Sequence, residues 1–291
     1  MSARDHNLPG DAPGFRALRW NMDWITRPLF GIGLAIIAIV SLFLGPLSFA
    51  LFIAIGATPA SFEWQRLVAQ GRPHHVPGAI GAATVALTVL AVGALYPLWV
   101  VMLAMVTGAA ALIVWARHEG RDFGWPLLGL FYLAIPCAAL VALPALRAAD
   151  GGRIVLGLFV IVWATDTGAL IVGNLVGGPR LAPKLSPGKT WSGTLGGSLI
   201  AGLAFGGFAV LLNGTGFLAA FLFGFLFSFV AHAGDLFESY VKRHFGAKNS
   251  GALIPGHGGV LDRIDSTMAA APALALLVFL FHFDPLLGLH P

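Results

Sequence analysis

The sequence is poor in charged residues and contains a single cysteine. Only 10% of its 291 residues are Asp, Glu, Lys or Arg, whereas a typical soluble domain has about 25%. Hydrophobic residues make up 57% of the chain. This composition excludes a soluble globular protein and predicts an integral membrane protein. The lone Cys137 excludes an intramolecular disulfide and is expected to be a small core residue.

Several common catalytic motifs are also missing. The sequence has no His and Cys residues at the spacing of a zinc site and no G-x-S-x-G motif of a serine hydrolase. Residues 188–190 read Gly-Lys-Thr, but a Walker A motif needs glycine where Pro183 stands, and no strand is expected before it. The first apolar stretch follows a long polar segment and lacks a cleavage pattern, so we expect a retained span and not a signal peptide.

Long apolar segments dominate the rest of the chain. A membrane-spanning helix needs about 20 predominantly apolar residues. Nine segments approach that length: 29–45, 47–64, 78–95, 97–116, 124–145, 153–174, 191–212, 215–233 and 267–285. We therefore expect an all-α polytopic membrane protein with about nine transmembrane helices, a count of eight being the alternative.

The distribution of Lys and Arg predicts the orientation of these spans. Cytoplasmic connections of membrane proteins carry an excess of both residues. With a cytoplasmic N-terminus, only Arg147 and Arg153 of the 17 Lys and Arg residues lie outside. The inside set is Arg4, Arg16, Arg19, Arg27, Arg66, Arg72, Arg117, Arg121, Arg180, Lys184, Lys189, Lys242, Arg243, Lys248 and Arg263. We therefore place the N-terminus and the polar loops in the cytoplasm.

The most informative polar run is 234–266, between two apolar segments. Its first part carries residues at i, i+3, i+4 and i+7, which share one face of a helix continuing from the preceding span: Asp235, Glu238, Ser239 and Lys242. Glycines at 256–259 would let backbone N–H groups approach an anion. Asp262 begins the last span, so two helices could bring Asp235 and Asp262 to one Mg²⁺, which prefers carboxylate and phosphate oxygens. The alternative is a salt-bridged loop.

Two further features are candidates for the same site. Residues 179–193 contain a compact set of side chains that can bind phosphate, namely Lys184, Ser186, Lys189, Thr190 and Ser192. The alternative is a loop without a binding role, whose lysines only reflect the excess of Lys and Arg in cytoplasmic connections. Asp166 lies within a span, where a charge costs about 2.5–3.5 kcal/mol and needs a partner; a neutralised structural Asp is the alternative. Glu63 ends another span and either lines the same cavity or anchors the helix at the interface.

A glycine pattern in the segment 191–212 predicts close helix packing. Glycines occur in pairs four residues apart at 193/197 and 202/206. Small residues at this spacing allow the backbones of two membrane helices to approach. We expect these pairs to serve packing, within the chain or between two copies of it.

The run from Ser239 to Asp265 reads S-x-V-K-R-x4-K-N-x-G-x2-I-P-G-H-G-G-V-x-D-R-I-D. It resembles the signature of the phosphatidate cytidylyltransferases, also called CDP-diacylglycerol synthases. Residues 163–168 and 184–191 resemble the same family. One position departs from the pattern: Asn249 stands where the family usually has Asp. Asn offers a carbonyl oxygen without charge, so a ligand or base role at this position is in doubt.

The resemblance implies transfer of the cytidylyl group of CTP to phosphatidic acid at the cytoplasmic face of the inner membrane. Expected catalytic residues are Asp235, Asp262, Lys242 and His257. Expected substrate-binding residues are Lys184, Ser186, Lys189, Thr190, Ser239, Arg243, Lys248, Gly258, Gly259 and Arg263. Asp235 and Asp262 would hold Mg²⁺, with Asp166, Glu238 and Asp265 as candidates for a second cation. Membrane lipids and a second copy of the chain are expected partners, and nucleic acid is not.

On this interpretation the chain has three parts. Residues 1–28 form a cytoplasmic or interfacial segment, 29–150 the N-terminal transmembrane helices, and 151–291 the catalytic transmembrane region with its loops. Two other functions stay open: another CTP-dependent lipid enzyme, such as a CDP-archaeol synthase-like protein or a polyprenol kinase, and an ion or anion transporter. The transporter explains Asp166 but not the clustering of acids, bases and glycines, and the sequence shows no internal repeat.

Overall fold

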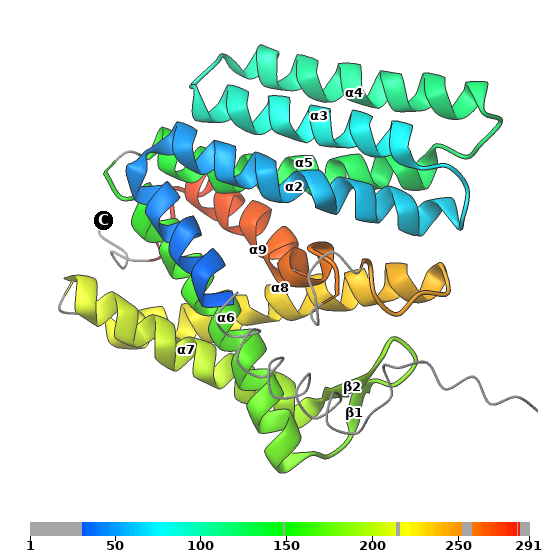
Figure 1. Cartoon of the computed structure of the whole chain (residues 1–291). Coiled ribbons are helices and arrows are strands. Elements are labelled where there is room, and N and C mark those ends of the chain that lie inside the picture. Colours follow the sequence, from blue (N-terminus) through cyan, green and yellow to red (C-terminus); the bar gives the residue numbers. More distant parts are fainter. Residues whose placement is uncertain (1–30, 148, 214–215, 252–257, 284, 286–291) are drawn as a thin grey trace, which may run out of the picture.

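A computed structural model describes the whole chain except residues 1–30, 148, 214–215, 252–257, 284 and 286–291. Most of the described chain is helical (Figure 1). The long helices are α2 (Pro46–Ala69), α3 (His75–Gly93), α4 (Leu98–His118), α5 (Gly124–Leu146), α6 (Gly151–Val176), α7 (Trp191–Asn213), α8 (Phe217–His244) and α9 (Leu261–Leu280). A shorter apolar helix, Gly31–Leu44, precedes them.

The prediction of an all-α polytopic membrane protein is confirmed. Within the described residues, eight helices are long and apolar enough to cross a membrane. In the predicted first span, 29–45, the described part is the helix Gly31–Leu44, which by itself is shorter than the about 20 residues that a crossing needs. Residues 29 and 30 lie outside the described residues. The predicted interfacial segment 1–28 lies outside the described residues.

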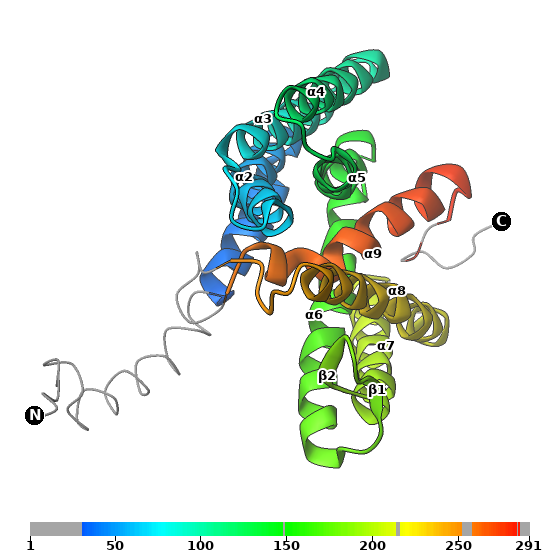
Figure 2. The same ribbon diagram turned by 90° about the vertical axis from the view of Figure 1, so that its right-hand side faces the viewer.

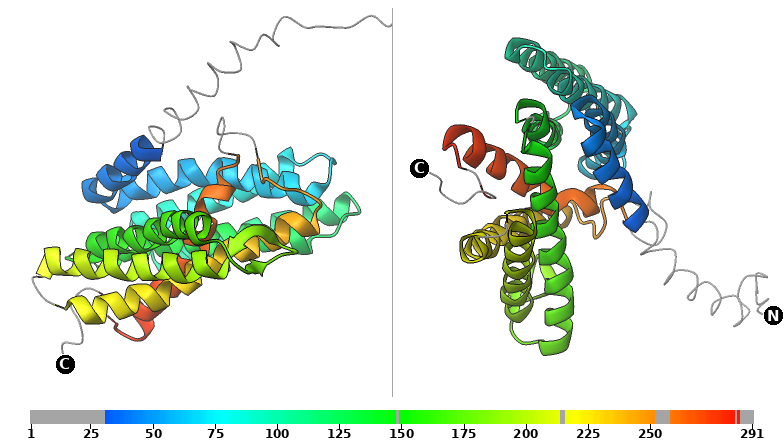
Figure 3. Two further views of the ribbon diagram at one scale, coloured as in Figure 1. Left: turned by 90° about the horizontal axis from the view of Figure 1, so that it is seen from below. Right: turned by 90° about the vertical axis from the view of Figure 1, so that its left-hand side faces the viewer.

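The helices form two groups joined by α9. Helices α2, α3 and α4 lie side by side with α4 outermost, and α5 packs against α2 and α3 (Figure 2). Helices α6, α7 and α8 form the second group. Helix α9 lies between the groups, in contact with α5 on one side and α8 on the other. Figure 3 shows helices of both groups running along roughly one direction, as in a bundle.

The paired glycines of α7 serve close helix packing, as predicted, and the structure shows this packing within the chain. A Cβ atom at Gly193 or Gly197 would overlap the backbone of α6. Gly202 and Gly206 lie equally close to Phe221 and Phe217 of α8. The small residues therefore let α7 approach both of its neighbours, which is the role that small residues have in membrane helix contacts.

Connections predicted to lie on the same side of the membrane meet at the same end of the bundle. The α2–α3 and α4–α5 connections and the C-terminal end of α8 all lie towards the right-hand side of Figure 1. The α3–α4 and α5–α6 connections lie at the opposite end. This grouping agrees with the predicted alternation of inside and outside segments. That the basic end faces the cytoplasm stays a prediction.

No strand was expected before residues 188–190, and this is wrong. Strand β1 (Arg180–Ala182) pairs antiparallel with β2 (Ser186–Thr190), and α7 begins directly after β2. A strand therefore does precede residues 188–190, contrary to the prediction. Its three residues are too few for an alternating pattern to reveal it. The Walker A motif stays excluded, because Pro183 occupies its first glycine position.

Candidate active site

A half-buried lysine on α8 joins two acidic residues. As the spacing predicts, Glu238 and Ser239 are buried, and Asp235 and Lys242 are half-buried on the same helix. Lys242 Nζ lies 2.5 Å from Glu238 Oε2 and 2.7 Å from Asp262 Oδ1. The Glu238 side chain is only 1% exposed. Because a buried carboxylate without a partner is costly, Lys242 stabilises this group, called here the Lys242 cluster (Lys242, Glu238 and Asp262).

A second ion pair connects the hairpin with α8. Lys189 of β2 places its Nζ atom 2.5 Å from Asp235 Oδ2, and these side chains are 19% and 30% exposed. Asp166 of α6 and Asp265 of α9 lie close enough to Asp235 for electrostatic repulsion between the carboxylates. The hydroxyl of Ser266 donates a hydrogen bond of 3.2 Å to Asp166 Oδ1, which supplies the polar partner expected for that carboxylate. Residues of α6, α8, α9 and the hairpin thus converge.

The glycine-containing turn before α9 holds Asp262. The backbone N–H of Ser250 donates to both carboxylate oxygens of Asp262, at 3.2 and 3.1 Å. The N–H of Gly259 donates to Oδ2 at 2.9 Å, next to Gly258, which has a φ of +86°. The Gly259 N–H, expected to face a phosphate, therefore binds Asp262 in this structure. His257 lies outside the described residues.

The predicted phosphate-binding residues of the hairpin differ in their surroundings. Lys184 is exposed in the turn, and Ser186 is half-buried on β2. Thr190 is buried, and its hydroxyl oxygen accepts a hydrogen bond of 3.0 Å from the N–H of Gly193. This is the contact of a helix N-cap, so Thr190 stabilises the start of α7. Its hydroxyl also lies 3.0 Å from that of Ser192.

The remaining predicted basic residues, Arg243, Lys248 and Arg263, are exposed. Arg243 ends α8 and donates from Nε to the carbonyl of Leu185 at 3.1 Å and from Nη1 to that of Ala247 at 3.0 Å. It thereby connects the end of α8 to the hairpin turn. Lys248 and Arg263 are also exposed. These long cationic side chains can meet an anion that arrives from solvent.

Glu63 has a larger role than the sequence indicates. It is 7% exposed in α2, and its carboxylate accepts hydrogen bonds from Ser250 Oγ at 3.2 Å, Val260 N at 3.0 Å and Leu261 N at 2.9 Å. It therefore binds the N-terminus of α9 from a helix almost 200 positions away in the sequence. A lone carboxylate in an apolar segment is the only sequence signal for this contact.

Tyr132 of α5 is a site residue that the sequence analysis missed. Its ring centroid lies 5.3 Å from that of Phe237 on α8. The hydroxyl is buried and has no hydrogen-bond partner among the described residues. It lies close enough to Asp265 and Glu238 to interact electrostatically with both carboxylates. One tyrosine in an apolar span gives no signal of such a position.

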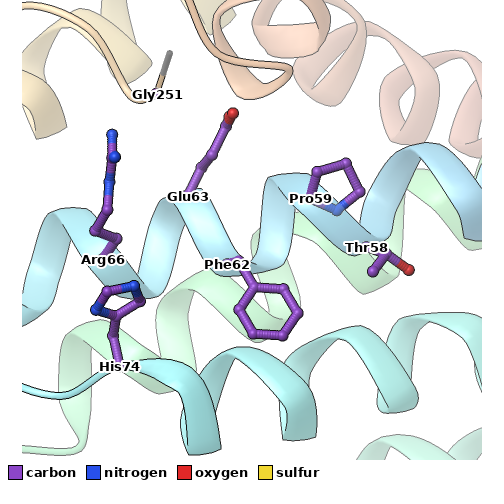
Figure 4. Close-up of a pocket in the computed structure, with 7 residues that line it drawn as sticks. All are labelled: Thr58, Pro59, Phe62, Glu63, Arg66, His74 and Gly251. Atoms are coloured by element: carbon purple, nitrogen blue, oxygen red, sulfur yellow. The ribbon is translucent and has the colours of Figure 1, made fainter. Parts of the chain in front are cut away.

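A cavity of about 570 Å³ lies beside α2. Its walls come from α2, the start of α3 and the chain after α8: Thr58, Pro59, Phe62, Glu63, Arg66, His74 and Gly251. Figure 4 shows Glu63 and Arg66 extending from α2 towards Gly251, while Phe62 extends towards α3. Arg66 Nη2 donates to the carbonyl of Ser250 at 2.9 Å. The cavity thus adjoins the residues that hold Asp262.

The carboxylates fit a cation that is shared with a substrate. Glu238 Oε1 is buried without a hydrogen-bond partner among the described residues, and Asp235 and Asp262 offer oxygen atoms from neighbouring helices. In the part of the chain that the structure describes, no three His, Cys, Asp or Glu side chains are grouped to hold a metal by themselves. Mg²⁺ commonly uses one or two carboxylates and completes its shell with water and substrate phosphates, and this donor set is suited to that mode.

Comparison with known proteins agrees with the sequence resemblance. A family model described as "Cytidylyltransferase family" matches residues 25–281. The chain is 40% identical over 265 residues to the phosphatidate cytidylyltransferase of Brucella suis biovar 1 (strain 1330), covering 88% of this chain and 93% of that protein. It is 36% identical over 200 residues to that of Rickettsia prowazekii (strain Madrid E), covering 66% and 86%. The chain therefore belongs to the cytidylyltransferase family.

Proposed function

We propose that this protein transfers the cytidylyl group of CTP to phosphatidic acid and forms CDP-diacylglycerol and diphosphate for phospholipid biosynthesis. Family membership and the names of its relatives support this reaction. The observation that carries the proposal is the convergence of two lysines and several carboxylates from α6, α8, α9 and the hairpin within a polytopic membrane protein.

The reaction makes one bond and breaks one. An oxygen of the phosphatidate phosphate attacks the α-phosphorus of CTP, and the bond from that phosphorus to the bridging oxygen breaks, so that diphosphate leaves with the electron pair. The attacking phosphate is already anionic at neutral pH and needs no strong base. Catalysis therefore depends on positioning the two phosphates and on stabilising the charge that develops between them.

The basic residues bind different phosphates in this proposal. Lys189 is the more exposed of the two paired lysines and can exchange Asp235 for a phosphate of CTP. Lys242, which is less exposed than Lys189, adds positive charge near the α-phosphate, and Arg243 adds positive charge from the exposed end of α8. Lys184, Ser186, Lys248 and Arg263 bind the outer phosphates. Ser239, Thr190, Gly258 and Gly259 stay predicted substrate-binding residues, although Thr190 caps α7 and the Gly259 N–H binds Asp262 before substrate enters. His257 donates to a phosphate or stabilises the turn.

Asp235 and Asp262 would hold Mg²⁺, and Asp166, Glu238 and Asp265 are candidates for a second cation. When bound, the ion supplies positive charge to the phosphate oxygens and lowers the barrier to in-line displacement. Until it binds, Lys189 and Lys242 neutralise these carboxylates and reduce the electrostatic repulsion between them.

The proposal places the protein in the cytoplasmic (inner) membrane with its active site facing the cytoplasm. The gathering of basic connections at one end of the bundle supports this orientation. Phosphatidic acid would then arrive laterally from the inner leaflet and CTP from the cytoplasm. A homodimer stays a prediction.

The reaction is tested with protein purified in detergent, phosphatidic acid, CTP labelled at the α-phosphate, and Mg²⁺. We expect label in the lipid phase and none after EDTA is added. A polyprenol kinase would transfer the γ-phosphate, release CDP and leave the α-label in water. Label that stays in the aqueous phase with folded protein would contradict the proposal.

A further inference from the structure

We propose that Glu63 is a positioning residue of the active site: it fixes the chain around Ser250 and Gly259 and thereby places Asp262. The inference rests on the proposed function, in which Asp262 is a site residue, and assigns a task to a side chain 199 positions earlier in the sequence.

The carboxylate of Glu63 caps α9 from outside the helix. The first N–H groups of a helix have no partners within it and need acceptors. Val260, which precedes α9, provides no side-chain cap. Glu63 Oε1 accepts the N–H of Val260, and Oε2 accepts that of Leu261. A negative charge is also favoured at this end of a helix by its dipole, which explains why a buried Glu63 is stable without an ion pair in the described chain.

Glu63 and Asp262 hold the same residue from two sides. The Ser250 hydroxyl donates to Glu63, while the Ser250 N–H donates to both oxygens of Asp262. Arg66, one turn after Glu63 on α2, donates to the Ser250 carbonyl. Every hydrogen-bonding group of Ser250 therefore has a partner on α2 or α9. The orientation of Asp262 depends on Ser250, and that of Ser250 depends on α2.

Two glycines make room for this arrangement. A Cβ atom at Gly259 would overlap Ser250 Oγ and Glu63 Oε2, and one at Gly251 would overlap Glu63 Oε1. The carboxylate is buried and bound by three donors, so it cannot move aside without losing those hydrogen bonds. Both positions thus need glycine for the close approach of Glu63, in addition to any role in binding an anion.

The test compares Glu63→Ala with Gln65→Met in full-length protein in detergent. Gln65 is also buried on α2, but its Nε2 donates to the carbonyl of Pro126 at the start of α5. Gln65→Met therefore removes a buried hydrogen bond of the same helix without touching Ser250 or α9. Hydrogen–deuterium exchange followed by mass spectrometry reports the amides of residues 259–262 directly.

We expect Glu63→Ala to accelerate exchange at 259–262 and Gln65→Met to leave it unchanged. Turnover should fall about 10- to 100-fold in Glu63→Ala, the usual cost of losing a residue that orients a ligand, and half-maximal turnover should need more Mg²⁺. Glu63→Gln keeps one acceptor oxygen, so its exchange rate at 259–262 and its turnover should lie between those of Glu63→Ala and the wild type. This variant keeps the test decisive if Glu63→Ala folds poorly.

Unchanged exchange in Glu63→Ala would overturn the inference. So would wild-type turnover and Mg²⁺ dependence in that variant, or an equal loss in Gln65→Met. If the wild type transfers no label to lipid, the proposed function fails, whereas the exchange measurement still decides whether Glu63 holds this segment.

Discussion

The two lysines that pair with carboxylates at α8 differ in burial and in the segments that their ion pairs connect. Lys242 contacts two carboxylates, and the side chains of Lys242, Glu238 and Asp262 are 12%, 1% and 11% exposed. Lys189 contacts one carboxylate, and it and Asp235 are 19% and 30% exposed. The Lys242 cluster also joins α8 to the turn before α9, whereas Lys189 comes from a short hairpin. We infer that the two ion pairs of Lys242 maintain the structure of the site and that the pair of Lys189 with Asp235 is the one that substrate displaces.

Removing Lys242 should have the largest effect. In Lys242→Met, Glu238 and Asp262 remain as buried carboxylates without their cation, which costs roughly 3–5 kcal/mol of folding free energy. We expect a large drop in thermal unfolding temperature in detergent, together with loss of turnover. Adding Glu238→Gln should recover part of the stability, because one of the two charges is then gone. Wild-type thermal stability in Lys242→Met would show that the cluster is not structural.

Asp235→Asn should affect turnover alone. The pair that it disrupts is partly exposed, and such pairs contribute about 0–1 kcal/mol to stability. We expect the unfolding temperature to stay near that of the wild type while turnover falls at least about 100-fold, the scale of removing one preorganised electrostatic contact. Asp150→Asn is the matched control, because Asp150 pairs with Arg147 at the opposite end of the bundle. Equal losses in both variants would refute a specific role for Asp235.

Lys189→Gln should have an intermediate effect, on CTP binding. A hydrogen bond to a charged group is worth about 1.5–3 kcal/mol, so the KM for CTP should rise roughly 10- to 100-fold. Lys189→Arg keeps the positive charge and should retain most of the affinity. Steady-state kinetics at saturating phosphatidic acid measures both. An unchanged KM in Lys189→Gln would mean that this lysine only neutralises Asp235.

Asn249→Asp should have the smallest effect. Asn249 is exposed after α8, and a charge added in contact with water is screened. We expect turnover within about twofold of the wild type, on the scale of exposed charge interactions. A large gain in turnover would show that the Asp usual at this position in the family takes part in the reaction.

The sequence predicts features that repeat within one helix better than contacts between distant segments. The spacing of Asp235, Glu238 and Lys242 predicts correctly that they share one face, because all three lie on α8. The paired glycines likewise predict the close packing of α7. The contact of Glu63 with α9 is not predictable, because no local pattern encodes which helix end a buried carboxylate will meet. The hairpin was missed for a different reason: its strands are too short to show a period.

The same limit applies to the pairing of charges in the site. The sequence predicts that Asp235 and Asp262 are ligands of one cation. The structure shows each of them bound to a different lysine, and the choice between Lys189 and Lys242 depends on how the hairpin and α9 fold back onto α8. A common cation stays a proposal that the lysine pairs neither require nor oppose.

Cytidylyl transfer on this face of α8 is best tested by measuring labelled CDP-lipid and diphosphate in the same reaction, with folded wild type and Asp235→Asn side by side. We expect equal amounts of both products from the wild type and almost none from Asp235→Asn. Equal product formation by the two proteins, or diphosphate released without labelled lipid, would contradict it.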